Sequence, residues 1–155
     1  MTGTIEARLA ENGITLPNAA APAGNYVAYV VSGTQVFISG QLPLVDGTTR
    51  FNGKLGESVS VEDGQKAARL CGLNLIAQLK AACGGDLDRV TRVIRLGGFV
   101  NSAPDFTDQP KVINGASDLM VEVFGEIGKH ARAAVGAASL PLGVSVEVEG
   151  LFEIR

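Results

Sequence analysis

The C-terminal segment has the pattern of a strand with only one buried face, and this pattern restricts the possible folds. In the segment 144–154 (VSVEVEGLFEI), three valines alternate with Ser145, Glu147 and Glu149. Because successive side chains of a strand point to opposite faces of its sheet, the valines share one face and the polar residues share the other. The sequence therefore predicts a sheet that is covered on one face only.

The remaining periodic segments supply helices and further strands. Helical spacing of apolar residues predicts two long helices, over 60–83 and 108–128, and a short one from Thr4 to Asn12. Segments rich in Val, Tyr and Ala predict the other strands, over 25–32, 35–39, 89–101 and 131–138, with 42–45 continuing the hairpin made by the first two. Gly97-Gly98 predicts a bulge or a close backbone approach within its strand.

This order of elements favours an α+β fold. Strands outnumber helices and do not alternate strictly with them, which argues against a doubly wound sheet. The simplest packing lays both long helices on one face of a single sheet. The other face carries small and polar residues, and we expect it to form a subunit interface. At 155 residues the chain is one domain, 1–155, in which 1–23 form an N-terminal helix and loop extension.

The composition argues against a nucleic-acid or membrane protein. The formal net charge is -3, and the 13 Lys and Arg residues are scattered along the chain. Proteins that bind nucleic acid cluster basic side chains to neutralise phosphates, so we do not expect such a partner. No signal peptide or membrane-spanning run is visible, so the default expectation is a cytoplasmic protein without a membrane partner.

The few cysteine and histidine residues restrict the chemistry. Cys71 and Cys83 fall on one predicted helix about 18 Å apart, too far for a disulfide. With a single histidine, His130, and no Cys-x-x-Cys, no metal-site spacing is visible. We expect the cysteines to be buried small hydrophobes, and we assign no catalytic role to His130.

Arg132 is the first candidate for chemistry. It lies near the start of a strand otherwise built from Ala, Val and Gly. A guanidinium in such surroundings either forms an internal ion pair or binds an anionic ligand. Its planar group can donate two parallel hydrogen bonds to the two oxygens of a carboxylate. A structural salt bridge to Glu147 or Glu149, on the C-terminal strand that we expect beside it, is the alternative.

Three weaker candidates lie on the other strands. Glu147 could handle protons if a partly dry interface raises its pKa, and otherwise it is a solvated or paired carboxylate. Ser39-Gly40-Gln41 breaks the end of a strand, where backbone N–H groups could hold an anion, or it is an ordinary turn. Tyr26 could donate a hydrogen bond to a ligand or simply cover the core. Together these residues indicate a protein that binds or converts a small carboxylate-bearing molecule.

The ordered set of these residues resembles the RidA/YjgF family (reactive intermediate deaminase A, or endoribonuclease L-PSP-like). The resemblance runs from about Gly24 to the C-terminus. Its motifs are Gly24-Asn25-Tyr26, the strand 36–43 (VFISGQLP), 112–114 (VIN), Arg132, Leu140-Pro141 and 146–149 (VEVE). The residue before Tyr26 is Asn25 instead of Pro, and His130 stands where Pro is more usual, so the chain resembles a divergent branch.

The resemblance implies a chorismate-mutase-like fold and a homotrimer with ligand sites between subunits, and it implies no metal or organic cofactor. The implied activity is hydrolysis of enamines and imines, such as 2-aminoacrylate, to 2-keto acids and ammonia. Arg132 would bind the substrate carboxylate and Glu147 would hold the attacking water. Ser39, Gly40 and Asn114 would line the pocket, which Tyr26 would close from a neighbouring subunit. A non-catalytic trimeric binder of small carboxylates is the alternative, and an endoribonuclease is a further one.

Overall fold

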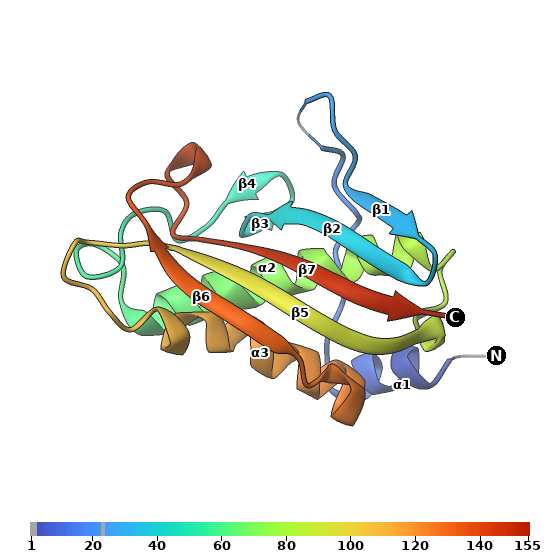
Figure 1. Cartoon of the computed structure of the whole chain (residues 1–155). Helices are drawn as coiled ribbons and strands as arrows, with labels where there is room; N and C mark the ends of the chain where they lie inside the picture. Colours follow the sequence, from blue (N-terminus) through green and yellow to red (C-terminus); the bar gives the residue numbers. More distant parts are fainter. Residues whose placement is uncertain (1–2, 23) are drawn as a thin grey trace.

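The computed structural model describes residues 3–22 and 24–155, which form an α+β domain, as predicted (Figure 1). Its helices are α1 (Thr4–Glu11), α2 (Val61–Ala82) and α3 (Gln109–Phe124), with 3-10 turns η1 (Leu87–Arg89), η2 (Gly125–Gly128) and η3 (Pro141–Gly143). Its strands are β1 (Tyr29–Ser32), β2 (Gln35–Gln41), β3 (Leu44–Val45), β4 (Thr48–Thr49), β5 (Val90–Asn101), β6 (Ala131–Ala137) and β7 (Val146–Ile154). Within these residues, no helix is long and apolar enough to cross a membrane.

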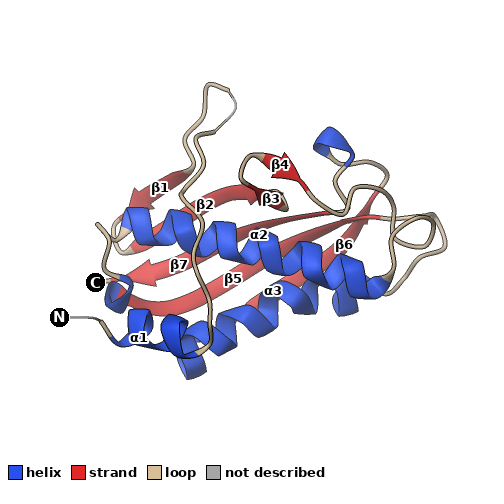
Figure 2. Cartoon of the chain, turned by 180° about the vertical axis from the view of Figure 1, so that it is seen from behind, coloured by secondary structure: helices blue, strands red, loops and turns tan. Residues whose placement is uncertain are grey.

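The main sheet is mixed and has helices on one side only. Its strand order is β1-β2-β7-β5-β6, in which β5 and β6 are parallel and the other neighbours are antiparallel. Both α2 and α3 lie behind the sheet in Figure 1 and in front of it in Figure 2. This is the predicted two-layer packing, and it leaves the opposite face of the sheet uncovered in the single chain.

The alternation of β7 divides its side chains between the two faces. Val146 and Val148 are fully buried under the helices, whereas Glu147 and Glu149 are partly exposed on the open face. The open face is more apolar than predicted: its exposed side chains include Val30, Phe37 and Val135. An apolar uncovered sheet face is typical of a surface that another chain covers.

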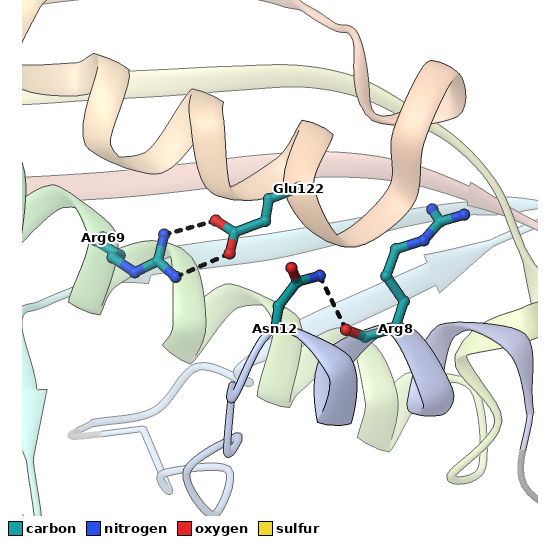
Figure 3. A network of polar contacts seen from close by, with 4 residues as sticks. All are labelled: Arg8, Asn12, Arg69 and Glu122. Carbon is teal, nitrogen blue, oxygen red and sulfur yellow. Dashed lines mark hydrogen bonds and ion pairs between the residues drawn. The ribbon is translucent and has the colours of Figure 1, made fainter.

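The two long helices are fixed to each other at close range. Ser60 accepts a hydrogen bond from the backbone N–H of Asp63 at 3.1 Å, which confirms the predicted cap of α2. Gly115 of α3 lies so close to α2 that a Cβ on it would be 2.0 Å from a backbone oxygen. Arg69 and Glu122 form a bidentate ion pair between the helices, in which two guanidinium nitrogens contact the two carboxylate oxygens at 3.0 and 3.5 Å (Figure 3).

The short helix α1 is held at both ends. The Asp88 carboxylate accepts backbone N–H bonds from Thr4 and Ile5 at 2.8 and 2.9 Å, and these bonds lower the pKa of Asp88. Arg8 donates to the carbonyl of Val123, in the last turn of α3, at 3.2 Å. Figure 3 shows this end of α1, where the Asn12 amide also donates to the Arg8 carbonyl. The chain then crosses α2 on its way to β1 (Figure 2).

Besides shifts of one or two residues at their ends, the strands differ from the prediction in three features. β1 begins at Tyr29 instead of Asn25, and Leu44–Val45 pairs with β4 in a separate two-stranded sheet instead of extending the hairpin. The register shifts of β5 lie between Val90 and Arg95, not at Gly97-Gly98. The predicted close approach at these glycines is correct, because a Cβ on Gly98 would lie 2.6 Å from the side chain of Ile113.

Candidate functional site

Arg132 lies on β6 and points to the helix side of the sheet. Its guanidinium donates to Asn114 Oδ1 at 2.8 Å and to Ser117 Oγ at 3.2 Å, both on α3. Neither bond neutralises its charge, and no carboxylate among residues 3–22 and 24–155 forms a salt bridge with it. The alternative of a salt bridge to Glu147 or Glu149 is therefore wrong, because β5 separates β6 from β7.

Ser117 links Arg132 to the only histidine. The Gly128 carbonyl lies 2.7 Å from His130 Nδ1 and can only accept, so Nδ1 carries a proton. In the neutral ring Nε2 then accepts from Ser117 Oγ, 2.9 Å away, and Ser117 in turn accepts from Arg132. His130 thus contacts the serine that accepts from Arg132, an arrangement that the sequence did not predict, and Ser117 was not among the candidate residues. The spacing of Ser117 three residues after Asn114 was the available signal, since such residues share one helix face.

Glu147 lies on the open face of the sheet, directly over β2. A Cβ built on Gly40 would be 2.4 Å from Glu147 Oε2, so only glycine leaves room for the carboxylate there. The pKa of Glu147 is raised, first by burial and second by the negative charge of Glu149. A half-buried carboxylate with a raised pKa is better suited than an exposed one to accept and return a proton.

A hollow of about 170 Å³ adjoins the end of β2. Ser39, Gly40 and Tyr26 line it together, as do residues of the segment 20–22. Tyr26 thus reaches these residues within its own chain, whereas we expected it from a neighbouring subunit. The Ser39 hydroxyl donates to the Val27 carbonyl at 2.9 Å, which fixes the loop that carries Tyr26.

The predicted site residues fall into two groups in the single chain. One group, on the open face and at the end of β2, contains Glu147, Gly40, Ser39 and Tyr26. The other group, Arg132 and Asn114, lies on the helix side of the sheet at its β6 edge. Because the sheet itself stands between them, the two groups cannot act on one small molecule within one chain.

The other cysteine, histidine and acidic residues that the structure describes form no second centre. Cys71 and Cys83 are buried free thiols, and burial raises the pKa of both. Within the described part of the chain, no three His, Cys, Asp or Glu side chains gather as a metal site would require. A larger hollow of about 380 Å³ lies between the segment 15–18, β3 and α2, and contains none of the predicted site residues.

The fold has close relatives. The chain is 55% identical to Protein TCP17 of Trypanosoma cruzi over 155 residues, which cover 99% of this chain and 96% of that protein. A Shewanella oneidensis crystal structure described as a putative endoribonuclease is 41% identical, with a TM-score of 0.94 and coverage of 98% and 100%. The structure of Escherichia coli TdcF with bound serine is 26% identical, with a TM-score of 0.64 and coverage of 89% and 94%.

A family comparison covers nearly the whole chain. Residues 6–153 match the family described as YjgF/chorismate mutase-like, putative endoribonuclease. The match begins inside α1 and therefore includes most of the segment before Gly24, where the resemblance noted from the sequence motifs started. These matches confirm the predicted chorismate-mutase-like α+β fold. The chain belongs to the YjgF/chorismate mutase-like family.

Proposed function

We propose that this protein hydrolyses imines and enamines derived from amino acids to 2-keto acids and ammonia. The observation that carries the proposal is the Glu147 carboxyl, which lies against Gly40 with its pKa raised by burial. A simple carboxylate-binding protein would gain nothing from a second negative charge beside its ligand. A hydrolase that must deliver water to a C=N bond needs such a group.

The reaction needs few groups. An enamine first takes up a proton on carbon and becomes the imine, whose protonated C=N carbon is electrophilic. Water adds to that carbon while ionised Glu147 accepts one of its protons, giving a carbinolamine. Glu147 then returns that proton to the carbinolamine nitrogen. As the C–N bond breaks and ammonia leaves, the carbinolamine hydroxyl gives its own proton to Glu147 and becomes the carbonyl of the 2-keto acid. Orientation of substrate and water supplies the acceleration, because the imine carbon is reactive without further activation.

Arg132 would bind the carboxylate of the substrate from a second copy of the chain. Its guanidinium is held by Asn114 and Ser117 and lacks a carboxylate partner among the described residues, which supports this role. The separation of Arg132 from Glu147 by the sheet and the apolar open face together support a homotrimer with intersubunit sites. The serine bound to TdcF supports a small amino-acid-like ligand.

An imine-trapping assay tests the proposal. An amino-acid oxidase would generate imino acids from a panel of amino acids, with semicarbazide as the competing trap, and loss of trapping would report hydrolysis. We expect wild type to suppress trapping and Arg132→Ala to lose this activity. Arg92→Ala is the matched control, because Arg92 is exposed on β5 and donates only to a backbone carbonyl.

The alternative is a trimer that binds small carboxylates without turning them over. If neither wild type nor the variants suppress trapping with any amino acid, the hydrolase proposal fails. Binding of 2-keto acids that is lost in Arg132→Ala would then favour the binder. Cleavage of RNA by wild type would favour the endoribonuclease activity that the family description names, although the net charge of -3 does not favour an RNA partner.

A further inference from the structure

The hollow beside Ser39 and Gly40 has a wall that belongs to the segment before β1. Of the lining residues other than the β2 end, those contributed by this segment and by the facing loops are apolar, apart from the Tyr26 hydroxyl. They are Ala20, Ala21, Pro22, Tyr26, Ala28, Leu42, Leu44 and Leu142. We propose that the segment 20–22 selects the substrate's side chain, and that it favours apolar side chains up to about the size of a phenyl ring. This inference rests on the proposed function and names the substrate class.

The position of the hollow relative to Glu147 supports this assignment. Gly40 lines the hollow and also lies under the Glu147 carboxylate, so the reacting carbon and the hollow are neighbours. A substrate held with its C=N carbon at Glu147 can therefore direct its side chain into the hollow. A charged side chain would lose its water there without gaining a charged partner, because none of the described residues that line the hollow is charged.

The volume of the hollow sets the size limit. It measures about 170 Å³. An apolar protein cavity of about 150 Å³ is large enough to bind benzene. Branched aliphatic side chains and a phenyl ring therefore fit into the hollow.

Two buried amides of α2 hold the walls in place. Gln78, only 3% exposed, donates through Nε2 to the Ala20 carbonyl at 2.7 Å. Asn74, one turn earlier on the same helix face, donates to the carbonyls of Leu42 and Leu44 at 2.9 and 3.2 Å. Since a buried amide left without a partner is costly, both walls are fixed with respect to α2 and the hollow keeps its shape.

The test is binding of stable 2-keto acids by calorimetry to wild type and to two variants of the same segment. We expect wild type to bind 4-methyl-2-oxopentanoate and phenylpyruvate about tenfold more tightly than pyruvate. Ala21→Phe fills the hollow, so it should abolish this preference by weakening binding of the two larger keto acids more than binding of pyruvate. Ala19→Phe is the matched control: it lines an adjacent hollow instead and should keep the preference.

Three results would overturn the inference: no preference in wild type, equal loss of all three ligands in Ala21→Phe, or equal effects of Ala19→Phe and Ala21→Phe. The imine-trapping assay separates this inference from the proposed function. Keto-acid selectivity without hydrolysis would reject the hydrolase and retain the inference. Hydrolysis without side-chain selectivity would retain the hydrolase and reject the inference.

Discussion

Gly40→Ala is the smallest change that should disturb the proposed chemistry. The new Cβ would lie 2.4 Å from Glu147 Oε2 and 3.0 Å from its Cδ. Real Cβ atoms essentially never approach another heavy atom below 3.0 Å, so the carboxylate must move by about 0.6 Å or more. Gly40 does not have a positive φ, so alanine introduces no backbone strain there.

The two consequences of this shift differ greatly in size. A misplacement of about 1 Å in a reacting group can lower the rate by about 100-fold, and we expect a loss of that order in kcat/KM. The clash involves only the end of a flexible side chain, so the free energy of unfolding should change by less than about 0.5 kcal/mol. A large loss of activity without a loss of stability is therefore the expected pattern.

A double-mutant cycle with Glu147→Ala makes the test specific. Imine hydrolysis and denaturant unfolding would be measured for Gly40→Ala alone and in the Glu147→Ala background. If the effect acts through the carboxylate, Gly40→Ala should have no further effect once Glu147 is absent. An unchanged rate for the single variant, or an equal loss in both backgrounds, would refute this reasoning.

Four further substitutions address the pH dependence, the arginine and the N-terminal helix. Because the charge of Glu149 helps to raise the pKa of Glu147, Glu149→Gln should move the acidic limb of the kcat/KM profile to lower pH. A raised pKa in the folded state contributes stability below the ordinary glutamate pKa that is lost as pH rises through the raised value, so the stability of Glu147→Gln relative to wild type should increase as pH rises above the ordinary glutamate pKa. Ser117→Ala removes one acceptor from Arg132 and should raise KM about two- to tenfold with kcat unchanged, and a fall in kcat alone would contradict this positioning role. Asp88→Ala removes the cap of α1 and should cost about 1 kcal/mol in urea unfolding. That cost should shrink as pH falls through the lowered pKa of Asp88, because protonation removes the charge that the variant lacks.

The fold was largely predictable because the informative patterns are local. The alternation of β7 and the Ser60 cap each depend on a few neighbouring residues, and both are confirmed. The strand neighbours were harder. We expected β6 and β7 to be adjacent because they are consecutive in sequence, but β6 pairs in parallel with β5 at the edge of the sheet. That pairing depends on long-range packing, which no local pattern encodes.

The site was predictable by residue type more than by arrangement. Arg132 was chosen because a guanidinium is unusual among Ala, Val and Gly, and Glu147 because a carboxylate at a partly dry interface could handle protons. Their placement on opposite sides of the sheet follows only from the topology. Ser117 and Gln78 were missed because a serine or glutamine on a helix carries no distinctive signal. Their roles appear only when the hydrogen bonds to Arg132 and to the Ala20 carbonyl are known.

Subunit mixing tests the central claim, that Arg132 of one copy and Glu147 of another form one site. Arg132→Ala and Glu147→Gln would each be purified inactive, then unfolded, mixed in equal amounts and refolded, with light scattering to verify assembly. Random assembly places an intact arginine opposite an intact glutamate in about one quarter of intersubunit sites. If Arg132 and Glu147 of different copies form one site, we expect recovery of about a quarter of wild-type imine hydrolysis. No recovery from properly mixed oligomers would contradict it, because a site built within one chain cannot be restored by mixing.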